Sequence, residues 1–159
     1  MAEFFSAADV VDAAVEIEKR GREVYRRLAH GATNPQVKAL FESLAVEEAR
    51  HEQLYAAMAK RIGAMRLPAG SGTDEYAQYV AALLDSHMLF SSSLAKDLDL
   101  YDRAGDMQAA VHGAMRLEKD TMVFFQEMMA LVPKSEQGNV EECIEEERRH
   151  LHQLAALLK

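Results

Sequence analysis

Apolar side chains recur at alternating steps of three and four residues in four long segments of the chain. Residues with this spacing line one side of an α-helix, so the pattern predicts four amphipathic helices. They cover residues 8–29, 35–62 and 106–131, and the last begins between residues 135 and 140 and ends near residue 158. Ser6 is the expected N-cap of the first helix, and Gly63 is expected to end the second.

Breaker residues separate the predicted helices. Residues 31–35 and residues 133–138 each contain glycine and proline, and both segments are short enough to fold two helices back on each other. Between these two pairs lie residues 65–105, which are too many for a turn and include two further apolar pieces. A helix of about 25 residues is roughly 35–40 Å long, so this connection can run along the bundle through one or two short helices. The sequence therefore predicts an all-α fold, a four-helix bundle of two antiparallel hairpins with a long central crossover.

Six residues of metal-binding type interrupt the apolar sides of these helices. They are Glu18 in the first helix, Glu48 and His51 in the second, Glu118 in the third, and Glu147 and His150 in the fourth. In the strings EEARH and EERRH a glutamate precedes a histidine by three residues, which places both on one side of a helix. One such pair is a weak signal, but Glu48 follows Glu18 by 30 residues and the second half repeats this interval as 29. Each folded hairpin would then supply half of one site.

Buried glutamates need a partner, because each costs several kcal/mol unless it is protonated, paired or bound to metal. Four converging carboxylates would repel one another, whereas two divalent cations balance their charge. The alternative is a rotated register that exposes the glutamates to solvent, but one rotation would have to disrupt four apolar sides together. Carboxylate and imidazole ligands suit iron or manganese, and zinc can also occupy such a site. We therefore predict a site for two metal ions.

Length, charge and cysteine content argue against several classes of protein. A length of 159 residues predicts a single domain over residues 1–159. The net charge of −8 disfavours nucleic acid or an anionic membrane as a partner. No long apolar run and no basic N-terminal segment occurs, so neither a membrane span nor a secretory signal is expected. The single cysteine, Cys143, excludes an intrachain disulfide or a four-cysteine metal centre and fits a reducing cytoplasm.

The order of these residues resembles that of the ferritin-like superfamily, and within it most resembles the rubrerythrin-type di-iron domain. The shared pattern is Glu, Glu-x-x-His, Glu, Glu-x-x-His on four helices, with a long connection after the second, and it covers nearly the whole chain. The resemblance implies a ferritin-like bundle that holds two iron ions. It further implies terminal carboxylates from Glu18 and Glu118, bridging carboxylates from Glu48 and Glu147, and imidazole ligands from His51 and His150.

Two features depart from the usual pattern of that family. Rubrerythrins typically carry a further glutamate one turn after the third-helix ligand, which exchanges with a histidine as the iron changes redox state, and here Thr121 stands in that place. Rubrerythrins also usually append a rubredoxin-like domain with a four-cysteine iron site, whereas this sequence has one cysteine. The expected electron donor is therefore a separate molecule, a rubredoxin-like protein or another reductase. The expected assembly is a homodimer.

The predicted function is that of a non-haem di-iron oxidoreductase whose reduced iron reacts with peroxide or dioxygen, as in protection against oxidative stress. No catalytic residue is expected beyond the metal centre itself. Two alternatives stay open, namely a ferroxidase that handles iron for storage and a metal-stabilised helical module for protein interaction. Turnover of peroxide, stoichiometric uptake of iron, or neither would separate the three.

Several neighbouring residues have more than one interpretation. Tyr25 and Tyr55 lie within two turns of a predicted ligand, so each ring either packs in the core or directs its hydroxyl to the centre as a hydrogen-bond donor or redox-active phenol. Glu47 and Glu146 directly precede predicted ligands but point about 100° away, which makes them poor metal ligands. His87 lies in the crossover, where it either approaches an open coordination position or is unrelated to the site.

Overall fold

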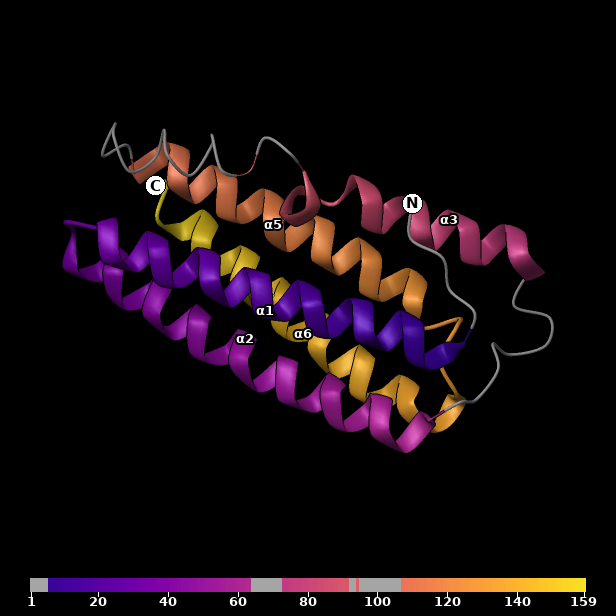
Figure 1. Ribbon diagram of the computed structural model, residues 1–159. Coiled ribbons are helices and arrows are strands. Elements are labelled where there is room, and N and C mark those ends of the chain that lie inside the picture. The colour runs from indigo at the N-terminus through magenta and orange to yellow at the C-terminus, as the bar shows by residue number, and fades with distance from the viewer. Residues whose placement is uncertain (1–5, 64–72, 92–93, 95–106) are drawn as a thin grey trace.

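The computed structural model describes residues 6–63, 73–91, 94 and 107–159. Four long helices form an elongated bundle (Figure 1): α1 (Ala7–Gly31), α2 (Pro35–Ile62), α5 (Met107–Met128) and α6 (Lys134–Ala156). A shorter helix, α3 (Thr73–Ser86), and a 3₁₀ turn, η1 (Met88–Phe90), come between α2 and α5 in the sequence. Every one of these elements is helical, which confirms the predicted all-α fold. No helix within these described ranges is both long and apolar enough to cross a membrane.

The ends of α1 and α2 follow local capping chemistry. Ser6 Oγ accepts a hydrogen bond from the backbone N–H of Asp9 at 3.3 Å, and Asp9 Oδ2 accepts one from the N–H of Ser6 at 2.7 Å. This reciprocal capping box begins α1 and confirms Ser6 as its N-cap. Asn34 caps α2 through its side chain, and Pro35 occupies the first helical position. Gly63 ends α2 at a φ of 57°, a left-handed value that glycine adopts without strain.

The bounds of α5 and α6 differ from the predicted ones by a few residues. α5 ends at Met128, where hydrogen bonds between residues three apart tighten the chain into a turn. α6 begins at Lys134, directly after Pro133, whose ring holds φ at −57° and lets the helix start at once. Gly138, which the sequence indicates as a breaker, lies inside α6. A single glycine in a long helix costs only about 1 kcal/mol, so the surrounding residues decide its conformation.

Two hairpins make the bundle. α1 packs against α2 and α5 packs against α6, while contacts between α1 and α5 and between α2 and α6 join the two pairs. α3 runs beside α5 in the opposite direction, so this part of the connection passes along the bundle, as the predicted crossover requires (Figure 1). The remainder of that predicted crossover, including its second apolar piece after Leu94, lies outside the described residues.

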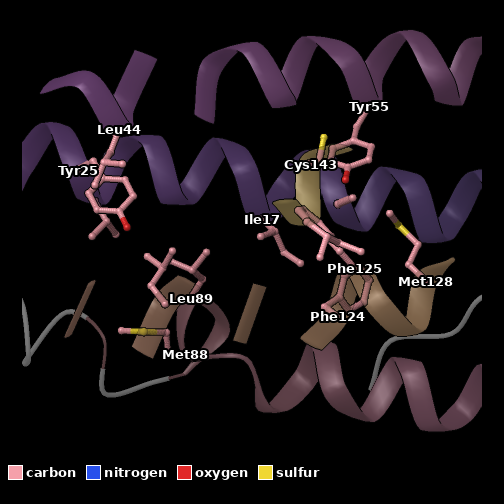
Figure 2. Close-up of a cluster of buried hydrophobic side chains, with 14 of the residues drawn as sticks. Ile17, Tyr25, Leu44, Tyr55, Met88, Leu89, Phe124, Phe125, Met128 and Cys143 are labelled. Carbon is pink, nitrogen blue, oxygen red and sulfur yellow. The ribbon is translucent and has the colours of Figure 1, made fainter. Parts of the chain in front are cut away.

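Aromatic rings pack on either side of the middle of the bundle. Tyr25 stacks on Phe41 with ring centroids 6.0 Å apart, and the rings of Tyr55 and Phe125 lie 5.0 Å apart. In Figure 2, Tyr25 and the Tyr55–Phe125 pair appear on opposite sides of Ile17, and all five side chains are at most 1% exposed. Burial of each large side chain contributes about 1.5–3 kcal/mol. These layers stabilise the bundle and shield its middle section from water.

Candidate metal centre

The four long helices direct six carboxylate and imidazole side chains, all of types that can bind metal, to one place inside the bundle. α1 contributes Glu18, α2 contributes Glu48 and His51, α5 contributes Glu118, and α6 contributes Glu147 and His150. None of the six is more than 1% exposed. They are the six residues predicted from the sequence, and the structure brings all of them together.

The six residues form two overlapping groups. One group contains Glu18, Glu48, His51 and Glu147, and the other contains Glu48, Glu118, Glu147 and His150. Within each group, one ligand atom from every residue lies within 4.8 Å of the others. Glu48 and Glu147 belong to both groups, whereas each histidine belongs to one. Two neighbouring ions that share two carboxylates would need this arrangement.

Several polar atoms that face this centre have no hydrogen-bond partner. They are Oε1 and Oε2 of Glu18, Oε1 of Glu48, Oε2 of Glu118, Oε1 of Glu147 and Nδ1 of His51. His51 Nδ1 lies 2.9 Å from Glu147 Oε1, but not in the direction that a hydrogen bond requires. Each unsatisfied buried group costs about 1–3 kcal/mol. Cations placed among these atoms would satisfy them, so the donor set fits a di-metal group.

Gly21 leaves room for one of the shared carboxylates. It lies on α1 one turn after Glu18, and a Cβ atom at this position would be 3.3 Å from Oε2 of Glu48. That separation is tighter than nearly all contacts of a real Cβ, so alanine would press on the carboxylate. The missing side chain at Gly21 therefore allows Glu48 to reach the centre.

Burial shifts three carboxyl groups of the centre towards their protonated forms. Burial, and after it the neighbouring Glu147, raises the pKa of Glu118 to about 8. Burial also raises the pKa values of Glu18 and Glu48 well above the ordinary 4.5, with nearby carboxylates adding to the effect. Metal ions would have to displace these protons, so binding should release protons into solution.

The two imidazoles and Glu147 have the opposite preference, since each favours its charged form. Burial by itself lowers the pKa of His51, but the contact with Glu147 outweighs it and raises the value to about 10. The pKa of His150 likewise rises to about 12, because its contacts with Glu118 and then Glu147 outweigh the effect of burial. Burial would raise the pKa of Glu147, but its contacts with Glu118 and both histidines lower it below its usual range. His150 and Glu147 can thus form a charge-assisted hydrogen bond, with His150 Nδ1 3.0 Å from Glu147 Oε2.

Carboxylates outside the centre orient both histidines. Nε2 of His150 lies 2.7 Å from Oε2 of Glu47, and Nε2 of His51 makes the equivalent hydrogen bond to Glu146. Each of these contacts joins α2 to α6, so each hairpin orients the histidine of the other. An imidazole nitrogen beside a carboxylate carries the proton, which leaves Nδ1 of both rings as the atom that faces the centre.

Sequence reasoning missed this role of Glu47 and Glu146. Neither residue belongs to the two ligand groups. Their signal was the repetition itself, since both EEARH and EERRH have a glutamate four residues before the histidine. Glu146 is further paired with Arg50 and with Arg149, the latter at 3.2 Å, which fixes its carboxylate beside His51.

The two tyrosines have different roles. The hydroxyl of Tyr25 donates a hydrogen bond to Oε1 of Glu118, across the junction between hairpins. Burial and the adjacent Glu118 raise the pKa of Tyr25, so its phenol stays protonated as the donor. Tyr55 makes no such bond to a ligand carboxylate among the described residues, and its ring lies beside Cys143 in the core (Figure 2). Burial raises the pKa of the Cys143 thiol to about 11, in keeping with a core residue.

His87 does not join either ligand group. Its Nε2 atom instead lies 3.1 Å from the hydroxyl oxygen of Thr121, and its side chain is buried. Of the two interpretations of His87, the structure therefore does not place it among the ligand groups, but it does place it against a residue one turn after Glu118 on α5.

Glu47→Gln and Glu146→Gln should each weaken metal binding by about 10–100-fold, because an amide orients the imidazole and supports its basicity less well than a carboxylate. Competition with a chromophoric chelator measures this affinity. Glu145→Gln is the matched control, since this exposed glutamate lies on α6 and pairs with Arg148 rather than with a histidine. Equal affinities in all three variants and the unmodified protein would contradict the proposed orientation.

Comparison with known proteins supports this description of the fold. The model of the Rubrerythrin family matches residues 9–158. The chain is also similar to a solved structure described as a ferritin-like diiron-carboxylate protein from Thermotoga maritima, with 20% sequence identity and a TM-score of 0.68. That match covers 99% of this chain and 97% of the other, and at this identity it shows the fold alone. No curated protein matches the chain.

Proposed function

This chain belongs to the rubrerythrin family, and from that premise we propose that it is a di-iron oxidoreductase that reduces hydrogen peroxide or dioxygen. The observation that carries the proposal is the overlap of the two ligand groups, because two buried carboxylates shared between two carboxylate–imidazole sets suit a pair of ions. Iron or manganese fits these oxygen and nitrogen ligands, and zinc can replace either metal during purification.

The proposed ligand roles follow from group membership. Glu18 and His51 would hold one ion, Glu118 and His150 would hold the other, and Glu48 and Glu147 would bridge them. This assignment supports the roles that the family resemblance implies. Four carboxylates balance the charge of two divalent ions, which makes the loaded centre neutral apart from exogenous ligands.

When bound, two Fe²⁺ ions supply the two electrons that, together with two protons, convert one hydrogen peroxide into two waters. The chain's own residues prepare the place for this reaction. Glu47 and Glu146 hold the imidazoles with Nδ1 facing inwards, and Tyr25 holds Glu118 from the opposite hairpin. The aromatic layers exclude bulk water, so charges inside the centre interact strongly.

The electrons that restore Fe²⁺ would come from outside the described part of the chain. Its one cysteine is buried in the core and cannot form a four-cysteine iron site. We therefore propose a rubredoxin-like protein or another reductase as partner, in the cytoplasm, with a homodimer as the working assembly.

Anaerobic peroxide titration tests the function. Protein loaded with two Fe²⁺ per chain should be fully oxidised by one equivalent of peroxide, and repeated turnover should follow when a reductant is present. Absorbance of the oxidised centre and peroxide consumption report the two steps. Continued uptake of iron beyond two ions per chain, without peroxide turnover, would favour the ferroxidase alternative, and failure to bind two ions would refute the di-iron proposal.

A further inference from the structure

The 3₁₀ turn η1 is fastened across α1 and α5 at the level of the centre. The backbone N–H of Met88 donates to Oδ2 of Asp120 at 3.0 Å, and the carbonyl of Leu89 accepts from Arg20 at 3.1 Å. Arg20 and Asp120 each lie two residues after the glutamate that their helix contributes to the centre. Figure 2 shows Met88 and Leu89 packed below α1. The turn therefore covers the α1 and α5 side of the centre.

The side chain of His87 is buried beside this turn, and its hydrogen bonds define which ring nitrogen carries the proton. Its Nδ1 atom accepts a hydrogen bond from the N–H of Leu89 at 3.2 Å, so Nδ1 must carry the lone pair. Burial lowers the pKa of His87 to about 4, which keeps the imidazole neutral near pH 7. The single ring proton is then on Nε2, and Nε2 donates to the Thr121 hydroxyl oxygen at 3.1 Å.

This arrangement leaves the proton of the Thr121 hydroxyl available. The oxygen of Thr121 accepts from His87, and no acceptor for its own proton occurs among the described residues. Thr121 is 1% exposed and lies on α5 three residues after Glu118, so it shares a helix side with that ligand. A buried hydroxyl proton without an acceptor costs free energy unless an exogenous group accepts it.

The positions of the histidines indicate where an exogenous group would lie. Both imidazoles reach the centre from α2 and α6, and their carboxylate partners also lie on those helices. The α1 and α5 side carries one carboxylate from each helix and is closed by η1. The Tyr25 hydroxyl on that side already donates to Glu118, and Thr121 and His87 form a second polar pair there.

We propose that Thr121, held by His87, donates a hydrogen bond to an anionic oxygen ligand such as hydroperoxide when this ligand binds at the centre on the α1 and α5 side. The inference rests on the proposed di-iron function and adds the residue that recognises its substrate. A neutral donor attracts an anion, whereas a carboxylate at the same place would repel it or compete for metal. Thr121 touches the ligand, and His87 is a positioning residue that fixes the direction of the hydroxyl.

Azide provides an unreactive anionic probe for this site. Optical titration of the oxidised, iron-loaded protein with azide should give a Kd at least about tenfold higher for Thr121→Val than for the unmodified protein, since a hydrogen bond to an ion is lost. Thr121→Ser keeps the hydroxyl and should restore most of the affinity. Thr33→Val is the matched control, because Thr33 is exposed in the turn between α1 and α2.

Variants of His87 separate positioning from packing. His87→Phe should raise the azide Kd, His87→Gln should recover part of the loss through its amide N–H, and His87→Phe should add little in the Thr121→Val background. In metal-free protein labelled with ¹⁵N-histidine, NMR should report a neutral His87 with its proton on Nε2. A proton on Nδ1 instead would overturn the donor arrangement.

The controls distinguish failure of this inference from failure of the proposed function. The first measurements are the iron content, helicity and peroxide oxidation of the unmodified protein. If this protein does not bind two irons, or if its reduced iron is not oxidised by peroxide, both proposals are wrong. If the unmodified protein binds two irons and reacts, but azide binds equally to it and to folded Thr121→Val, only the role of Thr121 is wrong. Thr121→Ala serves as the second hydroxyl-free variant should valine fail to fold.

Discussion

Replacing both His51 and His150 by alanine is expected to remove nearly all bound metal, while either single variant keeps part of it. Each histidine belongs to a different ligand group, so a single substitution leaves all four residues of the other group in place. The helices should persist, because both variants keep the buried apolar core that packs the four long helices together. Metal per chain after loading and dialysis, measured by mass spectrometry beside circular dichroism, checks this result.

His152→Ala is the matched control for that experiment. His152 lies on α6 two residues after His150, but its side chain is exposed. This variant should keep two metals per chain. Two metals per chain in the double His51 and His150 variant would show that the imidazoles are not ligands and would overturn the assignment of the centre.

Removal of metal by a chelator is expected to lower the melting temperature. Metal binds the native arrangement and relieves the repulsion between buried carboxylates, so it stabilises the folded state alone. A ligand at about 100 times its Kd contributes about 2.7 kcal/mol, which corresponds to roughly 5–10 °C for a chain of this size. Differential scanning calorimetry of the loaded and metal-free forms measures the shift. Equal melting temperatures would indicate that the four glutamates need no cation.

The metal-free form should also lose stability as pH rises. Glu118 has a folded-state pKa of about 8 against an ordinary 4.5, so its stabilising contribution is complete below pH 4.5 and disappears as pH approaches 8. Glu18 and Glu48 shift in the same direction. The contribution of His51 is present below pH 6.5 and is lost towards pH 10. The metal-free melting temperature should therefore fall between pH 6 and pH 9, and a rise over that range would contradict these protonation states.

The helices were predictable because their apolar period is a local property of the chain. Capping chemistry at Ser6 and the glycine at Gly63 are equally local, and both predicted ends are observed. The start of α6 was predicted too late, because Gly138 alone cannot break a helix whose neighbours pack on both sides. Local signals therefore predict that a helix exists more securely than they predict where it ends.

The six residues of the centre were predictable for a related reason. The intervals between Glu18 and Glu48 and between Glu118 and Glu147 differ by one residue, 30 against 29. Each pair of glutamates therefore lies level once its hairpin closes, and helical geometry turns the side chains to the same side. The orienting pairs were not predictable in this way. Glu47 and Glu146 stand at the same local position, but which histidine each one meets depends on how α2 packs against α6.

The sequence by itself determined the all-α bundle, its two hairpins and the set of buried glutamates and histidines, because helix period and residue interval operate over a few turns. Only the tertiary structure decided which side chains meet across helices, as with His51 and Glu146 or His87 and Thr121. These pairs are 95 and 34 positions apart, and each forms because packing sets the rotation of whole helices. No local sequence pattern predicts the rotation of each helix, because that rotation depends on the packing of all four helices and the crossover together.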